Sequence, residues 1–504
     1  MKTKKINKIL IANRGEIAIR VMRTCREMGI ATVAVYSEAD QAACFVRFAD
    51  EAYPIGPAPS SESYLCIDKI IEVARKAKVD AIHPGYGFLS EKSAFSKACQ
   101  ENGFIFLGPT PEAIEAMGDK VTARSYAKKA GLPMVPGTLE PVSDLGFIKK
   151  CAAEFGYPVL LKAAAGGGGK GMRVVNQESE IESAFAQASS EAQKAFGDGR
   201  MYLEKYIRNP RHVEAQIVCD EHGNGYFLLE RECSMQRRHQ KVIEEAPCSY
   251  LKEEVRRKLA ADALMLAKQI NYTGVGTIEF LVDEEQKHYF LEMNTRLQVE
   301  HCVTEEITGF DLVRLQIEVG QGQSLQIAQD TIVARGHAIE CRVYAEDPEN
   351  NFMPSPGKIA WMKVPEGPGI RHDSGVEAGS EISIYYDPMI AKLIVHADSR
   401  ERAIRKMDEA LAEYKIGGVR NNVAFLRKLL NTEEFKSEKQ HTQFIDRTPD
   451  LLKAGLVQVP LELVFGVAVF DLGQRVINGA PKSAGESSPW WQAGLVSSME
   501  KRGT

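Results

Sequence analysis

The sequence lacks the cysteine patterns that mark metal-binding and disulfide-stabilised proteins. Its ten cysteines are scattered along 504 residues, and no two of them form a Cys-X-X-Cys pair. The spacing of a structural zinc site is therefore missing. A chain of this length can also bury enough apolar surface to fold without disulfides. Unpaired thiols persist in reducing compartments, so we expect a cytoplasmic protein.

Long apolar runs and an excess of positive charge are missing as well. Nothing approaches the roughly eighteen uninterrupted apolar residues that suggest a membrane-spanning helix. The apolar run near the N-terminus ends at Asn13 and Arg14, which makes it too short for the core of a signal peptide. Lys and Arg number 63 against 68 Asp and Glu, a net charge of −5. We therefore expect neither a membrane nor a nucleic acid as a partner.

The sequence does contain the alternation typical of an α/β protein. Apolar residues make up 44% and charged residues 26% of the chain, as in ordinary globular proteins, and the length predicts about three domains. Two short apolar runs, residues 8–12 and 31–36, flank a segment with helical periodicity. This βαβ pattern predicts a parallel sheet. The connecting turn, residues 13–16, holds one glycine rather than the three of a dinucleotide-binding fingerprint, so a nicotinamide site is only weakly indicated.

A glycine-rich run with one lysine occupies residues 166–171. It is not a P-loop, because the first glycine of that motif falls on Ala164 and the position after the lysine is Gly171 rather than Ser or Thr. A flexible surface linker is one interpretation. The run, however, follows an apolar stretch that ends in Lys162 and precedes the apolar residues 172–175. That context favours a hairpin-like lid whose backbone N–H groups approach phosphates.

The segment EMNTRLQVEH, residues 292–301, alternates polar and apolar residues. In an extended chain alternate side chains share a face. One face would carry Glu292, Asn294, Arg296, Gln298 and Glu300. The other would carry Tyr289, Leu291, Met293 and Leu297. A solvent-facing strand has the same pattern, but Asn is disfavoured in strands, and the preceding strand, residues 275–282, is apolar apart from Thr277 and Glu279.

These two strands can form a hairpin. If the loop after Asp283 has four residues, Asp283 opposes His288. Glu279 then opposes Glu292, with Cβ atoms about 5 Å apart, and like charges at that distance are destabilising unless a positive group lies between them. Mg²⁺ prefers carboxylate oxygen, so this pair, with Asn294 beside it, forms a candidate Mg²⁺–nucleotide site. An odd-length loop would place the two glutamates on opposite faces.

The basic run RRHQK, residues 237–241, has two interpretations. A short basic run is usually a solvated surface, and a nucleic-acid patch does not suit a net charge of −5. The run is followed by Glu244 and Glu245. That acidic flank fits a local pocket for a small anion equally well.

Six segments together resemble the ATP-grasp biotin carboxylases. They are IANRGE at 11–16, HPGYGFLSE at 83–91, GGGGKGM at 166–172, RRHQKVIEE at 237–245, EMNTRLQVEHCVTEE at 292–306 and ECRVYAED at 340–347. The resemblance extends over residues 5–447, most of the chain. Two positions depart from the family's pattern. Ala165 replaces a glycine that is common in the lid, and Cys302 replaces the proline that usually follows Glu-His, but neither change removes a reactive group.

The resemblance implies an α/β multi-domain fold. A pre-ATP-grasp α/β domain, the N-terminal domain of biotin carboxylases, is expected over residues 1–117. An ATP-grasp core over residues 118–320 would include a mobile glycine-rich lid at about 135–203. A C-terminal α+β biotin carboxylase domain would follow over residues 321–447. Residues 448–504 are expected to be a C-terminal extension or the start of a linker to a further domain.

The resemblance also implies roles for residues of this sequence. The ATP-binding residues would be Lys120, Lys162, Gly168, Gly169, Glu204, Lys205, Tyr206, Ile207, His212, His239, Glu279 and Glu292. The bicarbonate-binding residues would be Lys241, Arg296, Gln298, Val299 through its backbone, and Glu300. Biotin would contact Tyr86 and Arg342, and the metal would be held by Glu279, Glu292 and Asn294. The catalytic residues would be Arg296, Glu300, Lys241 and Arg342, with Glu300 as the general base and Arg342 beside the ureido oxygen.

The activity that the resemblance implies is that of an ATP-dependent ligase that forms a C–N bond. Bicarbonate and ATP, with Mg²⁺ or Mn²⁺, would give carboxyphosphate, and the CO₂ released from it would carboxylate biotin. This is the first half-reaction of a biotin-dependent acetyl-CoA, acyl-CoA or pyruvate carboxylase, and the acetyl-CoA enzyme serves fatty acid biosynthesis. Family members are often homodimers.

The biotin is expected on a separate carrier protein or carrier domain, and a carboxyltransferase subunit would choose the final acceptor. Attachment lysines lie in Ala-Met-Lys-Met, whereas the nearest match here is Met362-Lys363 with unsuitable neighbours. Two other interpretations stay open. One is a different ATP-grasp ligase, such as a carbamoyl-phosphate or purine-pathway enzyme, and the other is a non-catalytic subunit that keeps the fold.

Overall fold

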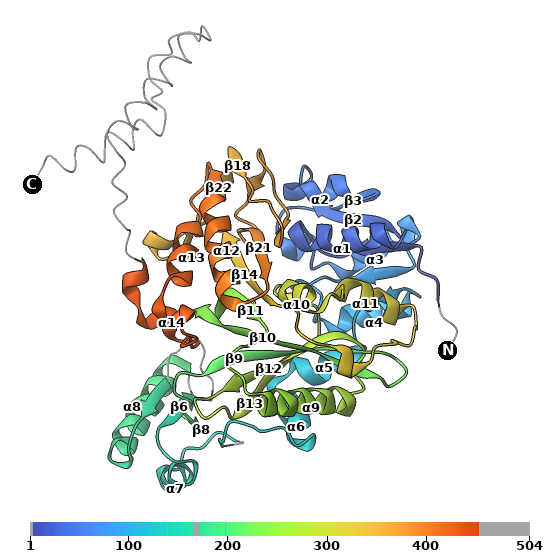
Figure 1. Cartoon of the computed structure of the whole chain (residues 1–504). Coiled ribbons are helices and arrows are strands. Elements are labelled where there is room, and N and C mark those ends of the chain that lie inside the picture. Colours follow the sequence, from blue (N-terminus) through green and yellow to red (C-terminus); the bar gives the residue numbers. More distant parts are fainter. Residues whose placement is uncertain (1–3, 139, 165–171, 197, 453–504) are drawn as a thin grey trace, which may run out of the picture. The chain divides into compact units, whose positions relative to one another are not determined.

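The computed structural model describes residues 4–452, except for residues 139, 165–171 and 197 (Figure 1). Its N-terminal part is built on a five-stranded parallel sheet in the order β3-β2-β1-β4-β5. The strands are β1 (Lys8–Ile11), β2 (Ala31–Ser37), β3 (Glu51–Gly56), β4 (Ala81–His83) and β5 (Ile105–Phe106). The helices of this part are α1 (Gly15–Glu27), α2 (Cys44–Phe48), α3 (Ile67–Ala77), α4 (Ser93–Glu101) and α5 (Pro111–Gly118).

Strand β1 is buried on both faces of this sheet. Ile9 and Ile11 belong to one hydrophobic cluster together with residues of α1, whereas Leu10 belongs to another together with residues of α3. A strand covered on both faces needs apolar residues at every position, which produces the continuous apolar run seen in the sequence. The βαβ unit and the parallel sheet predicted from that run are confirmed.

A larger antiparallel sheet follows, with eight strands in the order β13-β12-β9-β10-β11-β14-β21-β19. Its strands are β9 (Arg211–Cys219), β10 (Gly225–Arg237), β11 (Gln240–Ala246), β12 (Gly274–Val282), β13 (His288–Asn294), β14 (His337–Tyr344), β19 (Ile370–Ser374) and β21 (Met389–Ala397). The helices packed against it are α9 (Glu253–Gln269), α10 (His301–Thr308), α11 (Leu312–Gly320) and α12 (Arg400–Glu413) (Figure 1). Because β11 pairs with β14, one sheet spans the boundary expected at residues 320–321.

A three-stranded antiparallel sheet in the order β7-β6-β8 lies in the segment expected to form the lid. It consists of β6 (Val159–Ala163), β7 (Met172–Val175) and β8 (Met201–Lys205), with α7 (Leu145–Phe155) and α8 (Ile181–Phe196) packed on it. Lys162 at the end of β6 pairs with Met172 at the start of β7, which confirms the predicted hairpin. The glycines between them, including the predicted ATP-binding Gly168 and Gly169, lie outside the described residues.

Short elements complete the described part of the chain. The helices are α6 (Lys120–Lys129), α13 (Val423–Leu430), α14 (Glu433–Lys436) and α15 (Phe444–Arg447). The strands are β15 (Glu346–Asp347), β16 (Met353–Pro354), β17 (Gly357–Lys358), β18 (Trp361–Lys363), β20 (Glu381–Ile382) and β22 (Lys415–Gly417). None of the helices in residues 4–452 that could be searched is long and apolar enough to span a bilayer. Most of the extension expected at 448–504 lies outside the described residues.

The hairpin of β12 and β13 confirms one predicted pair and corrects another. Glu279 opposes Glu292, as predicted. The predicted pairing of Asp283 with His288 is wrong, because Val282 takes that position. The register then shifts by one residue between Phe280 and Glu279, as in a β-bulge. The turn and the bulge displace the register in opposite directions, so their effects cancel at the two glutamates.

The bulge also changes which side chains of β13 are buried. Leu291, expected on the apolar face, is instead 40% exposed, while Phe290 and Met293 are buried. The strand ends at Asn294, so the strand expected to continue to Glu300 is wrong beyond that residue, where a bend at Arg296 and a turn at residues 299–300 follow. Periodicity alone could not show this, because a bulge inserts a residue without breaking the sequence pattern.

A buried arginine ties the N-terminal part to the larger sheet's helices. Arg20 of α1 donates hydrogen bonds to Glu305 Oε1 of α10 at 2.6 Å and to Asp311 Oδ1 at 2.8 Å. We predict that Arg20→Met lowers the thermal midpoint by roughly 5–10 °C, since breaking one partner of a buried ion pair costs about 3–5 kcal/mol. Lys8→Met, which removes the partly exposed pair with Glu51, should change the midpoint by less than about 2 °C.

The pH dependence of this effect has a definite sign. Burial raises the pKa of Glu305, but the charge of Arg20 and the smaller contributions of its other neighbours together outweigh burial, and the pKa falls from 4.5 to about 2. The pair therefore stabilises the fold above pH 4.5 and loses this contribution as the pH falls toward 2. Differential scanning calorimetry should show the gap between wild type and Arg20→Met narrowing below pH 4.5. A gap that is constant or widens would contradict the assignment.

Candidate active site

A row of charged side chains crosses four neighbouring strands of the larger sheet. Glu292 of β13 pairs with Glu279 of β12, Glu279 with Glu214 of β9, and Glu214 with Arg231 of β10. Directly paired residues project to the same face of a sheet, so three carboxylates and one guanidinium lie side by side. Such a row of like charges is unfavourable unless further cations are supplied.

Lys241 of β11 supplies one of these cations. Its Nζ lies 3.0 Å from Glu279 Oε1 and 2.7 Å from Glu300 Oε1, and it also donates to Glu214. Glu300 is the residue just before α10, so the three carboxylates come from three separate places in the fold. All three glutamates are buried. One ammonium group therefore holds together two strands and the start of a helix.

His212 and Arg231 balance the remaining negative charge. His212 Nε2 lies 2.8 Å from Glu279 Oε2 and 3.2 Å from Glu214 Oε1. Burial lowers the pKa of His212, but the charge of Glu279 and the contact with Glu214 outweigh burial and raise it to about 9. The fully buried Arg231 donates from Nε to Glu214 Oε2 at 3.0 Å. Protonated His212 therefore acts as a second counter-ion for both glutamates at neutral pH.

The carboxylates stay ionised in this arrangement. Burial raises the pKa of Glu214, Glu279 and Glu300, but the charge of Lys241 and the other favourable contacts of each group together outweigh burial. The net result is a lowered pKa for all three, to about 2 for Glu300. Glu300 can therefore accept a proton, although a base this weak needs its surroundings to change before it works near neutral pH.

The polar residues predicted to share one face do converge on Glu279. Asn294 Nδ2 donates to Glu279 Oε1 at 2.6 Å, and Gln298 Nε2 donates to the same oxygen at 2.7 Å. Arg296 donates from Nη2 to Asn294 Oδ1 at 2.9 Å and from Nε to Glu91 Oε2 at 2.9 Å. The residues that the sequence pattern grouped therefore lie close together, even though the chain is not a strand beyond Asn294.

The predicted metal ligands Glu279, Glu292 and Asn294 lie together, but the charge of the two glutamates is balanced differently from what was expected. The opposed glutamates were expected to need a divalent cation between them, whereas Lys241 and His212 already balance the charge of Glu279. Glu292 forms no ion pair with any residue that the structure describes. Burial and the charge of Glu279 raise its pKa. Two carboxylates with one unmet negative charge fit the oxygen-rich coordination that Mg²⁺ prefers.

A cavity of about 520 Å³ opens between the N-terminal part and the larger sheet. It is lined by the predicted residues Tyr86, Arg296, Val299 and Arg342. Arg342 donates from Nε to Glu244 and from Nη2 to Glu300 Oε2 at 3.0 Å. Tyr86 donates its hydroxyl hydrogen to Glu16, which also lines the cavity. The lining residue Arg342 therefore connects the cavity to the Lys241 cluster through its ion pair with Glu300.

The predicted ATP-binding residues of the lid form contacts of their own. Lys162 of β6 is paired with Glu204 of β8. Lys205 donates from Nζ to the backbone oxygens of Gly156 and Tyr157 at 2.8 and 3.1 Å, and burial lowers its pKa. Next to it lie Tyr206, whose hydroxyl is 3.3 Å from Gln443 Oε1, and the half-buried Ile207.

The last two predicted nucleotide residues lie at element ends. Lys120 is the first residue of α6, and its charge lowers the pKa of Glu292, opposing the effect of burial. His239 is exposed in the two-residue turn between β10 and β11. The turn residues Arg238 and His239 have φ values of 48° and 66°. Positive φ suits this type of hairpin turn but strains residues other than glycine.

Several residues of the site were missed from the sequence. They are Glu16, Glu214, Arg231, Glu244 as the partner of Arg342, and Lys392. A signal was present for some of them, because His212, Glu214 and Gln216 alternate with apolar residues in a strand that is buried at every position. A lone lysine in the apolar strand around Lys392 is a similar signal. Such buried polar residues need partners that local periodicity does not reveal.

Three family models match the chain. The N-terminal domain of biotin carboxylase matches residues 5–114, the ATP-binding domain of the carbamoyl-phosphate synthase L chain matches 119–328, and the C-terminal domain of biotin carboxylase matches 340–447. The middle model carries the name of the rival ligase class. The two flanking models distinguish this chain from that class, because both belong to biotin carboxylase.

Individual proteins agree with these models. The biotin carboxylase of Halalkalibacterium halodurans is 52% identical over 438 residues, which cover 87% of this chain and 97% of that protein. The mitochondrial propionyl-CoA carboxylase alpha chain of Sus scrofa is 51% identical over 453 residues, covering 89% of this chain and 62% of the relative. The crystal structure of the biotin carboxylase domain dimer of Hydrogenobacter thermophilus 2-oxoglutarate carboxylase, with MgADP, ADP and bicarbonate, has a TM-score of 0.80 and 45% identity, and the match covers 90% of this chain and all of that one. The chain therefore belongs to the biotin carboxylase family.

Proposed function

We propose that this protein catalyses the ATP- and bicarbonate-dependent carboxylation of biotin, as an ATP-dependent ligase that forms a C–N bond. The observation that carries this proposal is the position of Glu300. It lies between Lys241 and Arg342, and Arg342 lines a cavity of about 520 Å³ together with Tyr86 and Arg296. A base between two cations, beside a cavity for an organic ring, is what joining bicarbonate to biotin requires.

Bicarbonate would bind to Lys241, Arg296, Gln298, the backbone of Val299 and Glu300. The first two residues are cations, and both already form ion pairs, Lys241 with Glu300 and Arg296 with Glu91. A bound anion would share Lys241 with Glu300 and weaken its hold on that carboxylate. The pKa of Glu300, which is lowered to about 2 while Lys241 is paired with it, would then rise toward the range in which a general base works.

ATP would lie between the lid and the larger sheet. Its binding residues would be Lys120, Lys162, Gly168, Gly169, Glu204, Lys205, Tyr206, Ile207, His212, His239, Glu279 and Glu292. Glu279, Glu292 and Asn294 would hold Mg²⁺ or Mn²⁺, and the bound ion would offset charge on the phosphates. The lysines would neutralise the same phosphates from the other side while bicarbonate attacks the γ-phosphoryl group.

The product of that attack would be carboxyphosphate, which breaks down to CO₂ and phosphate. The phosphate would take the proton from biotin N1′, and that nitrogen would then attack CO₂. Arg342 would stabilise the negative charge that develops on the ureido oxygen, because a fixed guanidinium in a buried site needs no reorganisation. Tyr86 would form part of the wall that holds the biotin ring.

The wider assembly follows from the same chemistry. Biotin would arrive on a carrier protein or domain, and a carboxyltransferase subunit would pass the carboxyl group to acetyl-CoA, another acyl-CoA or pyruvate. The related dimer supports a homodimer, and a role in fatty acid biosynthesis would follow if acetyl-CoA is the acceptor. A cytoplasmic location is supported by all ten cysteines being free.

Free biotin distinguishes this function from the two rivals. The purified protein with ATP, Mg²⁺ and bicarbonate should release ADP faster when free biotin is added, and labelled bicarbonate should appear in carboxybiotin. Another ATP-grasp ligase would cleave ATP without a response to biotin. A non-catalytic subunit would show a thermal shift with ATP but no turnover.

We predict that Glu300→Ala and Arg296→Ala each lower biotin carboxylation by at least about 100-fold, because one removes the base and the other a cation that holds bicarbonate. Steady-state ADP release with saturating ATP measures this. Glu285→Ala, a change at an exposed side chain, serves as the control and should keep the full rate. Undiminished bicarbonate-dependent ATP cleavage by Glu300→Ala would contradict the mechanism.

We also predict that Lys363 carries no biotin. It lies in β18, paired with Lys415 of β22, and lacks the Ala-Met-Lys-Met context of an attachment site. Intact-mass spectrometry after co-expression with a biotin ligase should show an unmodified chain. An added biotin that maps to Lys363 would overturn the proposal of a separate carrier.

A further inference from the structure

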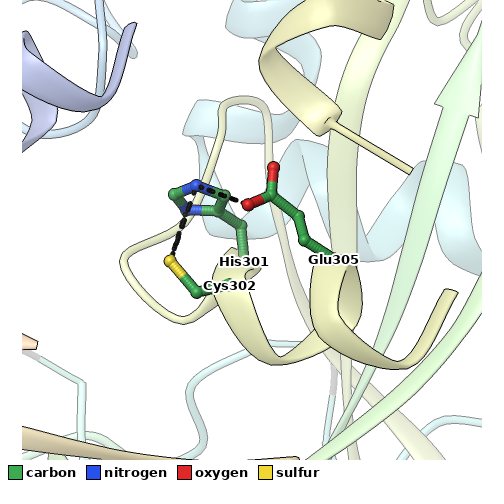
Figure 2. Close-up of side chains that lie close together, drawn as sticks. All are labelled: His301, Cys302 and Glu305. Carbon is green, nitrogen blue, oxygen red and sulfur yellow. Dashed lines mark hydrogen bonds and ion pairs between the residues drawn. The ribbon is translucent and has the colours of Figure 1, made fainter. Parts of the chain in front are cut away.

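Three side chains at the start of α10, His301, Cys302 and Glu305, lie close enough to suggest a metal site (Figure 2). All three are buried. Positive groups already occupy their surroundings, however. Glu305 is paired with Arg20 at 2.6 Å and Arg371 at 2.9 Å. The charges around this cluster therefore oppose a further cation.

The third cation in this region is Lys392, which lies 3.0 Å from Cys302 Sγ. Its side chain is completely buried. Lys392 of β21 pairs with Arg342 of β14, so both side chains project to the same face of the sheet. Arg342 turns toward Glu244 and Glu300. Lys392 instead contacts the backbone of Val299, the residue before Glu300.

Two consecutive backbone carbonyl groups, those of Gln298 and Val299, each accept a hydrogen bond from a buried side chain. His301 Nδ1 lies 2.7 Å from the oxygen of Gln298, and Lys392 Nζ lies 2.8 Å from the oxygen of Val299. A carbonyl acceptor requires that His301 Nδ1 carries the hydrogen. Because a peptide unit is planar, fixing each carbonyl also fixes the N–H that follows it, at Val299 and at Glu300. The segment proposed to bind bicarbonate is thus clamped at both peptide planes.

Lys392 also contacts a second residue that lines the cavity. Its Nζ lies 3.4 Å from Glu16 Oε1, the oxygen that accepts the hydroxyl hydrogen of Tyr86. Glu16 and Tyr86 belong to the N-terminal part of the chain, and both line the cavity, as does Val299. One ammonium group therefore connects the wall proposed for biotin to the segment proposed for bicarbonate.

We propose that Lys392 and His301 are positioning residues. They would hold residues 298–300, proposed to bind bicarbonate, at a fixed position relative to Glu16 and Tyr86, which lie where biotin is proposed to bind. The inference rests on the proposed function. Neither residue needs to touch bicarbonate or biotin to do this. Displacing a substrate-binding segment by about 1 Å can cost two orders of magnitude in rate, so loss of the clamp should appear in the kinetics of these substrates.

The first test replaces Lys392 with methionine, which keeps the length of the side chain and removes its charge. We expect Lys392→Met to raise the KM values for bicarbonate and for free biotin by at least about tenfold. The KM for MgATP should stay within about threefold, because the proposed ATP ligands are not contacted by Lys392. Steady-state ADP release, with each substrate varied in turn, separates the three constants.

Arg256→Met is the matched control. Arg256 of α9 donates from Nε to the buried Glu230 Oε1 of β10 at 2.8 Å, so this change also strips a buried carboxylate of its cation. It should lower the thermal midpoint and leave the KM values for bicarbonate and biotin unchanged. A shift of those KM values in the control as large as in Lys392→Met would overturn the proposal.

A pair of variants at His301 provides the second test. An asparagine amide can place a donor near the position of Nδ1, whereas phenylalanine keeps the ring without any donor. His301→Phe should raise the KM for bicarbonate by at least about tenfold, and His301→Asn should stay within about threefold of wild type. Equal effects of the two substitutions would overturn the role of the Nδ1 hydrogen bond.

The remaining outcomes also decide the matter. An active wild type with an unchanged, folded Lys392→Met overturns this inference alone. A wild type without biotin-stimulated ATP cleavage overturns the proposed function and this inference together. If Lys392→Met and His301→Phe both fail to fold while Arg256→Met folds, the clamp is structural only, and the proposal falls.

Discussion

The site depends on one buried electrostatic constraint, which is that Glu214, Glu279 and Glu300 share the ammonium of Lys241. Each carboxylate would be costly to bury alone. Together they are tolerable only because Lys241, protonated His212 and Arg231 lie among them. The low pKa of Glu300, about 2, measures how strongly the cations hold it. Substrate anions that enter such a site meet cations fixed in place before they arrive, which is the condition for electrostatic catalysis.

The antiparallel sheet makes this arrangement possible. Glu292, Glu279, Glu214 and Arg231 are cross-strand neighbours on four adjacent strands, so one row of the sheet collects charges that are far apart in the sequence. The same sheet continues into β14 and β21, where Arg342 and Lys392 are paired neighbours. One sheet therefore sets the spacing between the proposed metal ligands Glu279 and Glu292 and the pair Arg342 and Lys392, whereas the proposed base Glu300 is tied to the sheet by Lys241 and Arg342.

The parallel sheet and the pairing of Glu279 with Glu292 could be predicted from the sequence. The run around β1 is apolar because both faces are buried, and that predicted the parallel sheet. The pairing of Glu279 with Glu292 was predicted correctly although the turn register was wrong, because a bulge compensates for the turn. Bulges leave no trace in the polar–apolar pattern. The exposure of Leu291 could not be foreseen for the same reason.

The missed residues share a different cause. Glu214 and Arg231 lie 60 or more positions from the motif at residues 292–301, and Lys392 follows it at a similar distance. These residues belong to the site because of cross-strand pairing and burial, and neither can be predicted from the periodicity of a single segment. The resemblance to biotin carboxylases located the residues with family-wide motifs. The cations and carboxylates that hold those residues in place became visible only in the folded chain.

The central claim is that the Lys241 cluster is a preorganised site that exchanges its internal ion pairs for substrates. Crystals grown with ADP, bicarbonate and Mn²⁺, whose anomalous signal identifies the ion, test this most directly. The account predicts an ion about 2.1 Å from carboxylate oxygens of both Glu279 and Glu292, with Lys241 Nζ turned toward bicarbonate beside Glu300. An ion held elsewhere, with Lys241 still paired only to its glutamates and bicarbonate bound apart from Glu300, would contradict it.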